Sequence, residues 1–172
     1  PLSEVEIAEW RRMQAVNVEA PIALTQMCLP HFEKDSRILQ MSSGAIYYPT
    51  TQYAAYCLSK AALNMAYQLF RTECAPKGIS VGSVCPGIVD TAMTDLIAAP
   101  DWQQCYDSSR VFNELKQNQQ MLSVETVAAF LTWLLFEVDA ETYRKAEWDI
   151  YETSHHENWL GDLPFYAPDF ID

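Results

Sequence analysis

The chain has 172 residues, 49% of them hydrophobic and 20% charged, which is typical of a soluble globular protein with one sizeable core. Its 11 Lys and Arg against 23 Asp and Glu give a net charge of −12, and a surface this acidic repels phosphate backbones and anionic lipid. Composition therefore argues against nucleic acid and membrane as partners. No leader segment is recognised, nor the run of ~18 apolar residues that a membrane span needs. We expect a single cytoplasmic domain over residues 1–172.

Cysteine and histidine are placed unfavourably for disulfides and for a metal ion. An odd number of cysteines without a C-x-x-C pair predicts reduced core thiols, at Cys28, Cys57, Cys74, Cys85 and Cys105. On a strand the adjacent His155 and His156 would point to opposite sides, and His31 is remote in sequence. We therefore expect no metal site.

The first predicted elements are a long helix and a strand. Ser3 followed by Glu6 is typical of a capping box, and the apolar pattern that follows predicts a helix to about residue 29, where Pro30 stops it. The short apolar run 37–43 ends in two serines and predicts a strand.

Helices and strands then alternate along the chain. A helical pattern covers residues 52–75, an apolar strand covers 79–87, and a further helix begins after Ser123 as its N-cap. Residues 91–121 show no sustained period, so we expect a loop with short helical pieces that covers a substrate. Residues 147–151 predict a final strand.

The order of these elements predicts the fold class. Strands that alternate with crossover helices indicate an α/β protein with a parallel sheet, a three-layer doubly wound and Rossmann-like arrangement. Such sheets bind ligands outside the carboxyl ends of their strands. Ser42 and Ser43 follow the first strand, and Pro86 and Gly87 end the second, so we expect these residues at the ligand-binding edge.

Tyr56 and Lys60 are four residues apart on a predicted helix, so they share one face about a turn apart. A phenol has a pKa of about 10 and exchanges protons poorly at neutral pH, whereas a cation held nearby stabilises its anion. Lowering that pKa by ~3 units takes ~4 kcal/mol and makes the phenol a general acid. On its own, the pair also fits a surface tyrosine beside a solvated lysine.

With Ser43 thirteen residues before Tyr56 and the sequence PGIVDT at residues 86–91, the pair resembles the short-chain dehydrogenase/reductase family. In that family the serine orients the substrate carbonyl, and the tyrosine donates or accepts the proton. The lysine binds the nicotinamide ribose and lowers the pKa of the tyrosine. The resemblance implies these roles for Ser43, Tyr56 and Lys60, with Ser42 as the adjacent competitor for the role of the serine.

Asn17 resembles the fourth catalytic member of the family, an asparagine whose main chain holds a water linked to the lysine. The residues support this independently, because Pro21 has no N–H and cannot make the helical hydrogen bond to the Asn17 carbonyl. That carbonyl is then left for a water, and the helix is expected to kink there. An ordinary proline kink with an idle asparagine is the alternative.

The resemblance also implies a nicotinamide cofactor, NAD or NADP, without deciding between them. Pro86 and Gly87 resemble the turn under the nicotinamide, and Ile88 would offer backbone contacts to its carboxamide. Thr91 would reach the carboxamide or the diphosphate, and a plain N-cap of the following helix is the other role open to it. The expected cofactor-binding residues are Tyr56, Lys60, Pro86, Gly87, Ile88 and Thr91.

The Gly-rich phosphate-binding turn of the family is absent, because the five glycines are scattered at positions 44, 78, 82, 87 and 161. The resemblance runs from about residue 1 to residue 151, and it covers only the second half of a dinucleotide-binding fold. At ~30 residues per βαβ unit, we expect roughly 80 to 100 residues to be missing upstream. We therefore expect this chain alone to be inactive.

The sequence thus predicts an oxidoreductase that interconverts a carbonyl and an alcohol of a small-molecule substrate by hydride transfer with the nicotinamide cofactor. A catalytically silent NAD(P)-sensing regulator or scaffold is the alternative, and an epimerase or dehydratase is a third reading. The helices predicted for residues 3–29 and 52–75 resemble the dimer-forming pair of the family, so we expect a homodimer or homotetramer. An apolar, aromatic substrate pocket is expected from the flanking residues Tyr47, Tyr48, Tyr53 and Met93.

Overall fold

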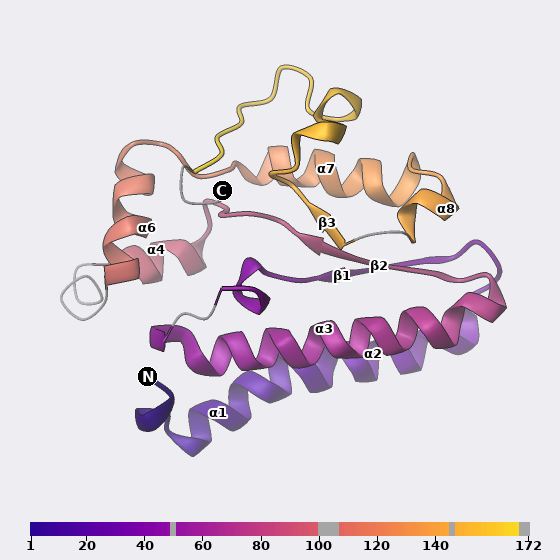
Figure 1. The fold of residues 1–172 in the computed structure, drawn as a ribbon, viewed down its shortest axis with the longest axis horizontal. Helices are drawn as coiled ribbons and strands as arrows, with labels where there is room; N and C mark the ends of the chain where they lie inside the picture. Colours follow the sequence, from indigo (N-terminus) through magenta and orange to yellow (C-terminus); the bar gives the residue numbers. More distant parts are fainter. Residues whose placement is uncertain (49–50, 100–106, 145–146, 169–172) are drawn as a thin grey trace. The chain divides into compact units, whose positions relative to one another are not determined.

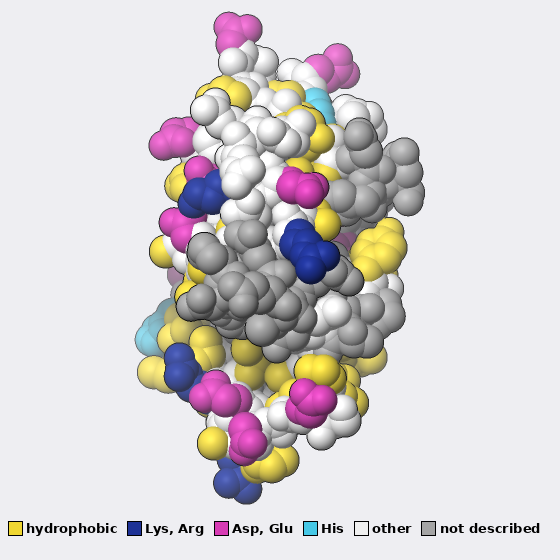
Figure 2. All heavy atoms as spheres, turned by 90° about the vertical axis from the view of Figure 1, so that its left-hand side faces the viewer, with side chains coloured by type: hydrophobic (Ala, Val, Ile, Leu, Met, Phe, Trp, Pro, Cys, Tyr) yellow, Lys and Arg dark blue, Asp and Glu magenta, His cyan; other side chains and the backbone are white. Residues whose placement is uncertain are grey.

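The computed structural model of the chain describes residues 1–48, 51–99, 107–144 and 147–168. The chain divides into two compact units, Pro1–Cys85 with Val138–Trp148, and Pro86–Glu137 with Asp149–Asp172. Acidic and hydrophobic side chains are interspersed over the face drawn in Figure 2, in keeping with the net charge of −12.

The first unit begins with a short turn rather than with the long helix expected from residue 3. Leu2–Glu4 is a 3-10 turn, and helix α1 (Ile7–Gln14) begins only after Val5 and Glu6, whose backbones are extended. No side chain caps either start, so the predicted capping box of Ser3 and Glu6 is wrong. The extended backbone at these two positions separates the serine from the helix that it was expected to cap.

A π-helical turn, Ala15–Glu19, joins α1 to α2 (Ala20–Cys28). Pro21 lies in the first turn of α2 and has no N–H to offer the carbonyl of Asn17, four residues earlier, so regular α-helical bonding is broken here. Where a kink was expected from Pro21, the structure has a π-helical turn. The helix ends as predicted, in the 3-10 turn Leu29–His31 that contains Pro30.

Strands β1 (Arg37–Met41) and β2 (Ser80–Cys85) pair in parallel, and β3 (Glu147–Asp149) completes the order β1-β2-β3. Helix α3 (Ala54–Cys74) connects β1 to β2, as a parallel pair requires. The three predicted strands are confirmed, each with fewer residues than expected. Because α3 returns the chain from the end of β1 to the start of β2, its first turn lies at the carboxyl end of β1.

Helices α2 and α3 lie side by side on one face of β1 and β2 (Figure 1). The buried core between α3 and the strands consists of Tyr67, Phe70, Cys74, Ile79 and Val81. The partly buried residues packed against it are Ile22, Leu29, Phe32 and Ile38. This packing fixes α3 on the sheet, and with it the side chains of its first two turns.

Tyr143 belongs to a short helix, α8 (Ala140–Tyr143), which was not predicted. Its side chain is fully buried, its hydroxyl donates to the Ile38 carbonyl at 2.9 Å, and the Arg37 guanidinium lies 5.0 Å from its ring centroid. A Cβ on Gly82 of β2 would lie 2.7 Å from the Tyr143 ring. The glycine therefore permits the close approach of ring and strand.

In the second unit, α4 (Ala92–Ala98) and α6 (Asp107–Gln117) occupy much of the region predicted as a loop. The prediction of short helical pieces holds for α4, whereas α6 is longer than expected, and residues 100–106 lie outside the described part. Helix α7 (Val124–Phe136) begins as predicted, with Ser123 Oγ accepting the Thr126 N–H at 3.0 Å.

The segment after β3 packs its rings against α7 within the second unit. The 3-10 stretch Thr153–Asn158 carries His155, whose ring stacks on Phe130 of α7 with centroids 5.1 Å apart. Trp159 packs against the same phenylalanine at 4.9 Å. This aromatic segment continues to residue 168, where the described residues end.

Within the residues that the structure describes, no helix is long and apolar enough to cross a membrane, and no group of His, Cys, Asp and Glu could hold a metal ion. In this part of the chain, Cys28, Cys57, Cys74 and Cys85 are not in disulfides. Cys28 is exposed, so it is not the core thiol that was expected, and Cys105 lies outside the described residues.

Candidate active site

Ser43 lies two residues beyond the end of β1, where the chain turns into Gly44–Ile46. Its Oγ accepts the N–H of Ala45 at 3.2 Å, which fixes the hydroxyl at the carboxyl end of the strand. The neighbouring Ser42 points elsewhere: its hydroxyl is buried and has no hydrogen-bond partner among the described residues. The preference for Ser43 over Ser42 is therefore consistent with the geometry.

Tyr56 lies in the first turn of α3, partly buried, with the Ser43 side chain near its hydroxyl. Burial raises the pKa of this phenol above its ordinary value, hydrogen bonding by Ser43 opposes that rise, and the nearby thiols of Cys85 and Cys57 add to it. The described residues thus keep Tyr56 protonated at neutral pH.

Lys60 lies one turn further along α3, with its Nζ 5.7 Å from the centroid of the Tyr56 ring. The ammonium donates to the carbonyl of Met41, at the end of β1, at 3.0 Å. Burial lowers the pKa of Lys60. The lysine therefore lies beside the tyrosine as the spacing predicts, but the lowered tyrosine pKa that the resemblance implies is not produced by these residues alone.

Asn17 in the π-helical turn is connected to Tyr56 through a residue that sequence reasoning missed, Ser59. Asn17 Nδ2 donates to Ser59 Oγ at 3.0 Å, and Ser59 Oγ donates to the Tyr56 carbonyl at 2.7 Å. Ser59 is fully buried. The one signal for it in the sequence is a small polar residue on the inward face of an otherwise apolar helix.

The segment from Pro86 to Thr91 belongs to the second unit. Gly87 has a φ of +76°, and a Cβ there would lie 2.8 Å from both Leu122 and Tyr151, so glycine is required by backbone and packing alike. The N–H of Ile88, expected to face a carboxamide, donates to the Tyr151 hydroxyl at 2.8 Å. This tyrosine is a second residue that sequence reasoning missed.

Thr91 takes the N-cap position of α4, the role that was open as an alternative to cofactor contact. Its N–H donates to Thr94 Oγ1 at 2.9 Å, as one half of a capping box. The N-cap role is compatible with the predicted cofactor contact, which stays a prediction.

The residues expected to line a substrate pocket are mostly at the surface. Tyr47 and Tyr48 of the first unit are 63% and 65% exposed, and Met93 of the second is 60% exposed. The Tyr47 hydroxyl donates to the carboxylate of Glu147, which also accepts from Ser83 Oγ at 3.1 Å. Glu147 therefore ties the turn after Ser43 to the sheet, and it too was not predicted.

Within the first unit, the fold thus brings together three groups that could act on a carbonyl oxygen. The hydroxyls of Ser43 and Tyr56 lie near each other, and both can donate to a carbonyl. The Lys60 ammonium has three N–H donors, of which one is used by Met41, so two are left for a ligand with hydroxyl groups. These residues fit the ribose of a nicotinamide cofactor.

Known proteins resemble this chain in sequence and in fold. The family model described as short chain dehydrogenase matches residues 1–102. A benzil reductase ((S)-benzoin forming) of Bacillus cereus is 31% identical over 140 residues, which cover 78% of this chain and 56% of the relative. The chain spans about half the length of the curated relatives it matches.

Solved structures confirm the predicted Rossmann-like α/β class, of which the described sheet and helices are a part. The KRED1-Pglu enzyme has a TM-score of 0.74 and 29% identity, over 83% of this chain and 59% of its own. The angucycline C-6 ketoreductase LanV with bound NADP has a TM-score of 0.69 and 26% identity, over 86% of this chain and 54% of its own. With more than half of its residues matched by the family model, the chain belongs to the short-chain dehydrogenase family.

Proposed function

We propose that the protein carrying this chain is an oxidoreductase that interconverts a carbonyl and an alcohol with a nicotinamide cofactor. The observation that supports this best is the grouping of Ser43, Tyr56 and Lys60, with the Ser43 side chain near the Tyr56 hydroxyl and the Lys60 ammonium 5.7 Å from the Tyr56 ring. A benzil reductase and a C-6 ketoreductase among the similar proteins agree with it. No observation favours a catalytically silent regulator.

Ser43 and Tyr56 hold the substrate oxygen in the proposed mechanism. A bound nicotinamide cofactor would supply or accept the hydride at the carbonyl carbon. As negative charge develops on the oxygen, Tyr56 transfers its proton to it, and the Ser43 hydroxyl keeps its own hydrogen bond to the same atom. The phenolate that is left lies beside the Lys60 ammonium, which stabilises it.

The electrostatics of Tyr56 favour the direction of reduction. A proton donor must hold its proton at working pH, and burial raises the pKa of Tyr56, so the donor form dominates at neutral pH. Oxidation of an alcohol needs the phenolate, which the described residues disfavour. We therefore propose a carbonyl reductase, and we take ketones and diketones as the first substrates to test.

Asn17 acts as a positioning residue in this proposal. Its side chain holds Ser59, which in turn holds the carbonyl of Tyr56, so the π-helical turn and the first turns of α3 are fixed to one another. Its own carbonyl lacks an N–H partner at Pro21 and remains the proposed acceptor for a water linked to Lys60.

The cofactor is proposed to be NAD or NADP, and the bound NADP of LanV supports a nicotinamide without choosing between them. Lys60 and Tyr56 would hold its ribose. Pro86, Gly87, Ile88 and Thr91 remain proposed contacts by resemblance. The Ile88 N–H now donates to the Tyr151 hydroxyl, so it would have to give up this hydrogen bond in order to donate to the carboxamide.

We also propose that the chain forms a homodimer or homotetramer in the cytoplasm. Helices α2 and α3 expose large apolar side chains that a second copy could cover, namely Leu24, Met27, Met65 and Leu69. Light scattering of the purified protein tests the assembly.

Substitution of Tyr56 by phenylalanine tests the proposed function. The protein that carries this chain is incubated with NADH or NADPH and a panel of ketones, diketones and aldehydes, and the loss of nicotinamide absorbance is followed. We expect Tyr56→Phe to lower the turnover rate by about 100-fold or more, because a general acid typically accelerates the reaction by about 10²–10⁴-fold. Cofactor binding, measured by fluorescence titration, should stay within about twofold of the unaltered protein if the phenyl ring retains its place. Turnover that survives the substitution would falsify the mechanism.

A further inference from the structure

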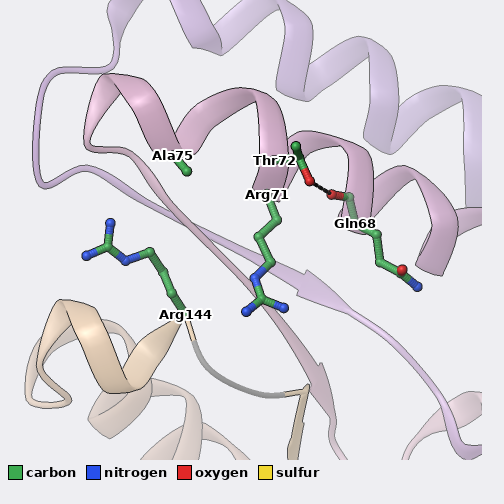
Figure 3. A pocket seen from close by; sticks show the side chains of 5 residues that line it. All are labelled: Gln68, Arg71, Thr72, Ala75 and Arg144. Carbon is green, nitrogen blue, oxygen red and sulfur yellow. Dashed lines mark hydrogen bonds between the residues drawn. The ribbon is translucent and has the colours of Figure 1, made fainter.

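A cavity of about 480 Å³ lies in the first unit, between the last turns of α3 and the residue that follows α8. Figure 3 shows its lining, Gln68, Arg71, Thr72, Ala75 and Arg144. Two of these five side chains are guanidinium groups, and none is a carboxylate. The cavity is therefore lined by positive charge in a chain whose net charge is −12.

The two arginines come from different elements and are only half-exposed. Arg71 extends from α3 toward the strands, and Arg144 approaches from the end of α8 (Figure 3). Arg144 Nε donates to the Ala140 carbonyl at 2.8 Å, which anchors the side chain and leaves its terminal N–H groups available. In the described part of the chain, neither arginine forms an ion pair with a carboxylate.

Local structure explains one arginine but not the pair. Arg71 lies in the last turn of α3, where a cation offsets the negative end of the helix. Arg144 is not part of that helix, so this effect does not account for its place at the cavity. Two partly desolvated like charges at one cavity repel each other, and an anion between them would reverse the sign of the interaction.

A buried phenol lies next to Arg71 on the same helix. Tyr67, one turn before Arg71, is 4% exposed. Burial raises the pKa of this phenol, the charge of the Arg71 guanidinium and its hydrogen bonding with the phenol oppose the rise, and the Glu147 carboxylate adds to it. A neutral phenol does not neutralise the guanidinium, so the positive charge of Arg71 is left for a ligand.

We propose that this cavity binds the oxyanion of a small molecule, a phosphate or a polycarboxylate, between Arg71 and Arg144. The planar fork of a guanidinium matches the oxygens of either group in a bidentate manner. Arg71 follows Tyr56 by fifteen residues on the same helix, a distance of about 22 Å along its axis. The site is therefore separate from the proposed catalytic residues, and it does not depend on the proposed function.

Calorimetric titration with inorganic pyrophosphate and, in a second arm, with citrate tests the proposal. Ionic strength is kept constant with potassium chloride, because salt screens charge on its own. We expect saturable binding in at least one arm, and the arm that binds identifies a phosphate or a polycarboxylate as the ligand group. Arg71→Gln and Arg144→Gln should each weaken binding by about tenfold or more, since each removes charge-assisted hydrogen bonds.

The matched control is Arg12→Gln, which removes the same charge from an exposed position on α1 in the same unit. It should bind as the unaltered protein does. Thr72→Asp tests the site without removing either arginine, so a loss of binding cannot come from misfolding caused by the loss of an arginine. It places a negative charge at an exposed position of the cavity wall, and it should also weaken binding about tenfold. The proposal is wrong if neither anion binds, or if the Arg71 and Arg144 variants bind as tightly as the Arg12 variant.

Discussion

Acidification should destabilise the second unit through His155, because the ring is held in one neutral tautomer. The indole Nε1–H of Trp159, which can only donate, donates to His155 Nδ1 at 2.9 Å, so Nδ1 carries no proton. Nε2 then carries the proton and donates to the Asp149 carbonyl at 3.0 Å. The side chain is 6% exposed and stacks on Phe130, so neither contact is readily replaced by water.

Protonation of His155 would place a second N–H against the indole N–H of Trp159. One hydrogen bond is lost and a buried donor is left without an acceptor, which costs roughly 1–3 kcal/mol. In agreement, burial lowers the pKa of His155, and the Asp149 carbonyl and the carboxylates of Glu152 and Asp149 oppose that effect only in part. The neighbouring His156 lowers the same pKa when it is charged.

The sign of the pH dependence follows from this lowered value. The folded protein binds the His155 proton less tightly than the unfolded chain, whose histidine pKa is about 6.5. The stabilisation is therefore complete above that pH and is lost as the pH falls below it, by at most ~1.4 kcal/mol per pH unit. Below the folded-state pKa the loss levels off.

Urea denaturation between pH 5 and pH 8, followed by tryptophan fluorescence, measures this effect. His155→Asn keeps an acceptor for the indole but does not titrate, so its free energy of unfolding should fall less on acidification than that of the unaltered protein. The difference should be roughly 1 kcal/mol or more. His31→Gln, at an exposed histidine of the first unit, is the control and should follow the unaltered protein. Parallel curves for all three proteins would refute the tautomer argument.

Two further substitutions test the packing and the helix geometry of the first unit. Gly82→Ala places a Cβ 2.7 Å from the buried Tyr143 ring and should lower the free energy of unfolding by about 1–3 kcal/mol in urea denaturation, whereas Gly44→Ala, with its nearest contact at 4.0 Å, should have little effect. Pro21→Ala restores an N–H for the Asn17 carbonyl and should slow turnover more than it weakens cofactor binding; unchanged kinetics would remove the role proposed for Asn17.

Local spacing allowed much of the site to be predicted. Their spacing of four residues places Tyr56 and Lys60 on the same face of a helix, and helix α3 forms as the apolar pattern indicates. Ser43 is different, because nothing local links it to a helix that begins eleven residues later. It was found through the order of motifs in the resemblance.

Contacts between residues far apart in sequence were beyond such reasoning. Ser59 meets Asn17 across 42 residues, and Tyr151 meets Ile88 across 63, and no periodicity encodes either pair. The capping box at Ser3 failed for a related reason. Its residue types fit, but the extended backbone at Val5 and Glu6 moved the helix start to Ile7.

The electrostatics of Tyr56 indicate what the proposed cofactor would have to add. Burial raises the pKa of the phenol, and Lys60 loses part of its affinity for a proton through the same burial, so proximity alone does not make the tyrosine acidic. The Lys60 ammonium donates a hydrogen bond to the Met41 carbonyl, and this bond fixes the ammonium beside the Tyr56 ring. An acidic Tyr56 therefore requires further positive charge near the ring, and the oxidised form of the proposed nicotinamide cofactor would carry such a charge. In the proposed mechanism the tyrosine would then be a proton donor by default and a base only with the oxidised cofactor bound, which would couple the direction of proton transfer to the redox state of the cofactor.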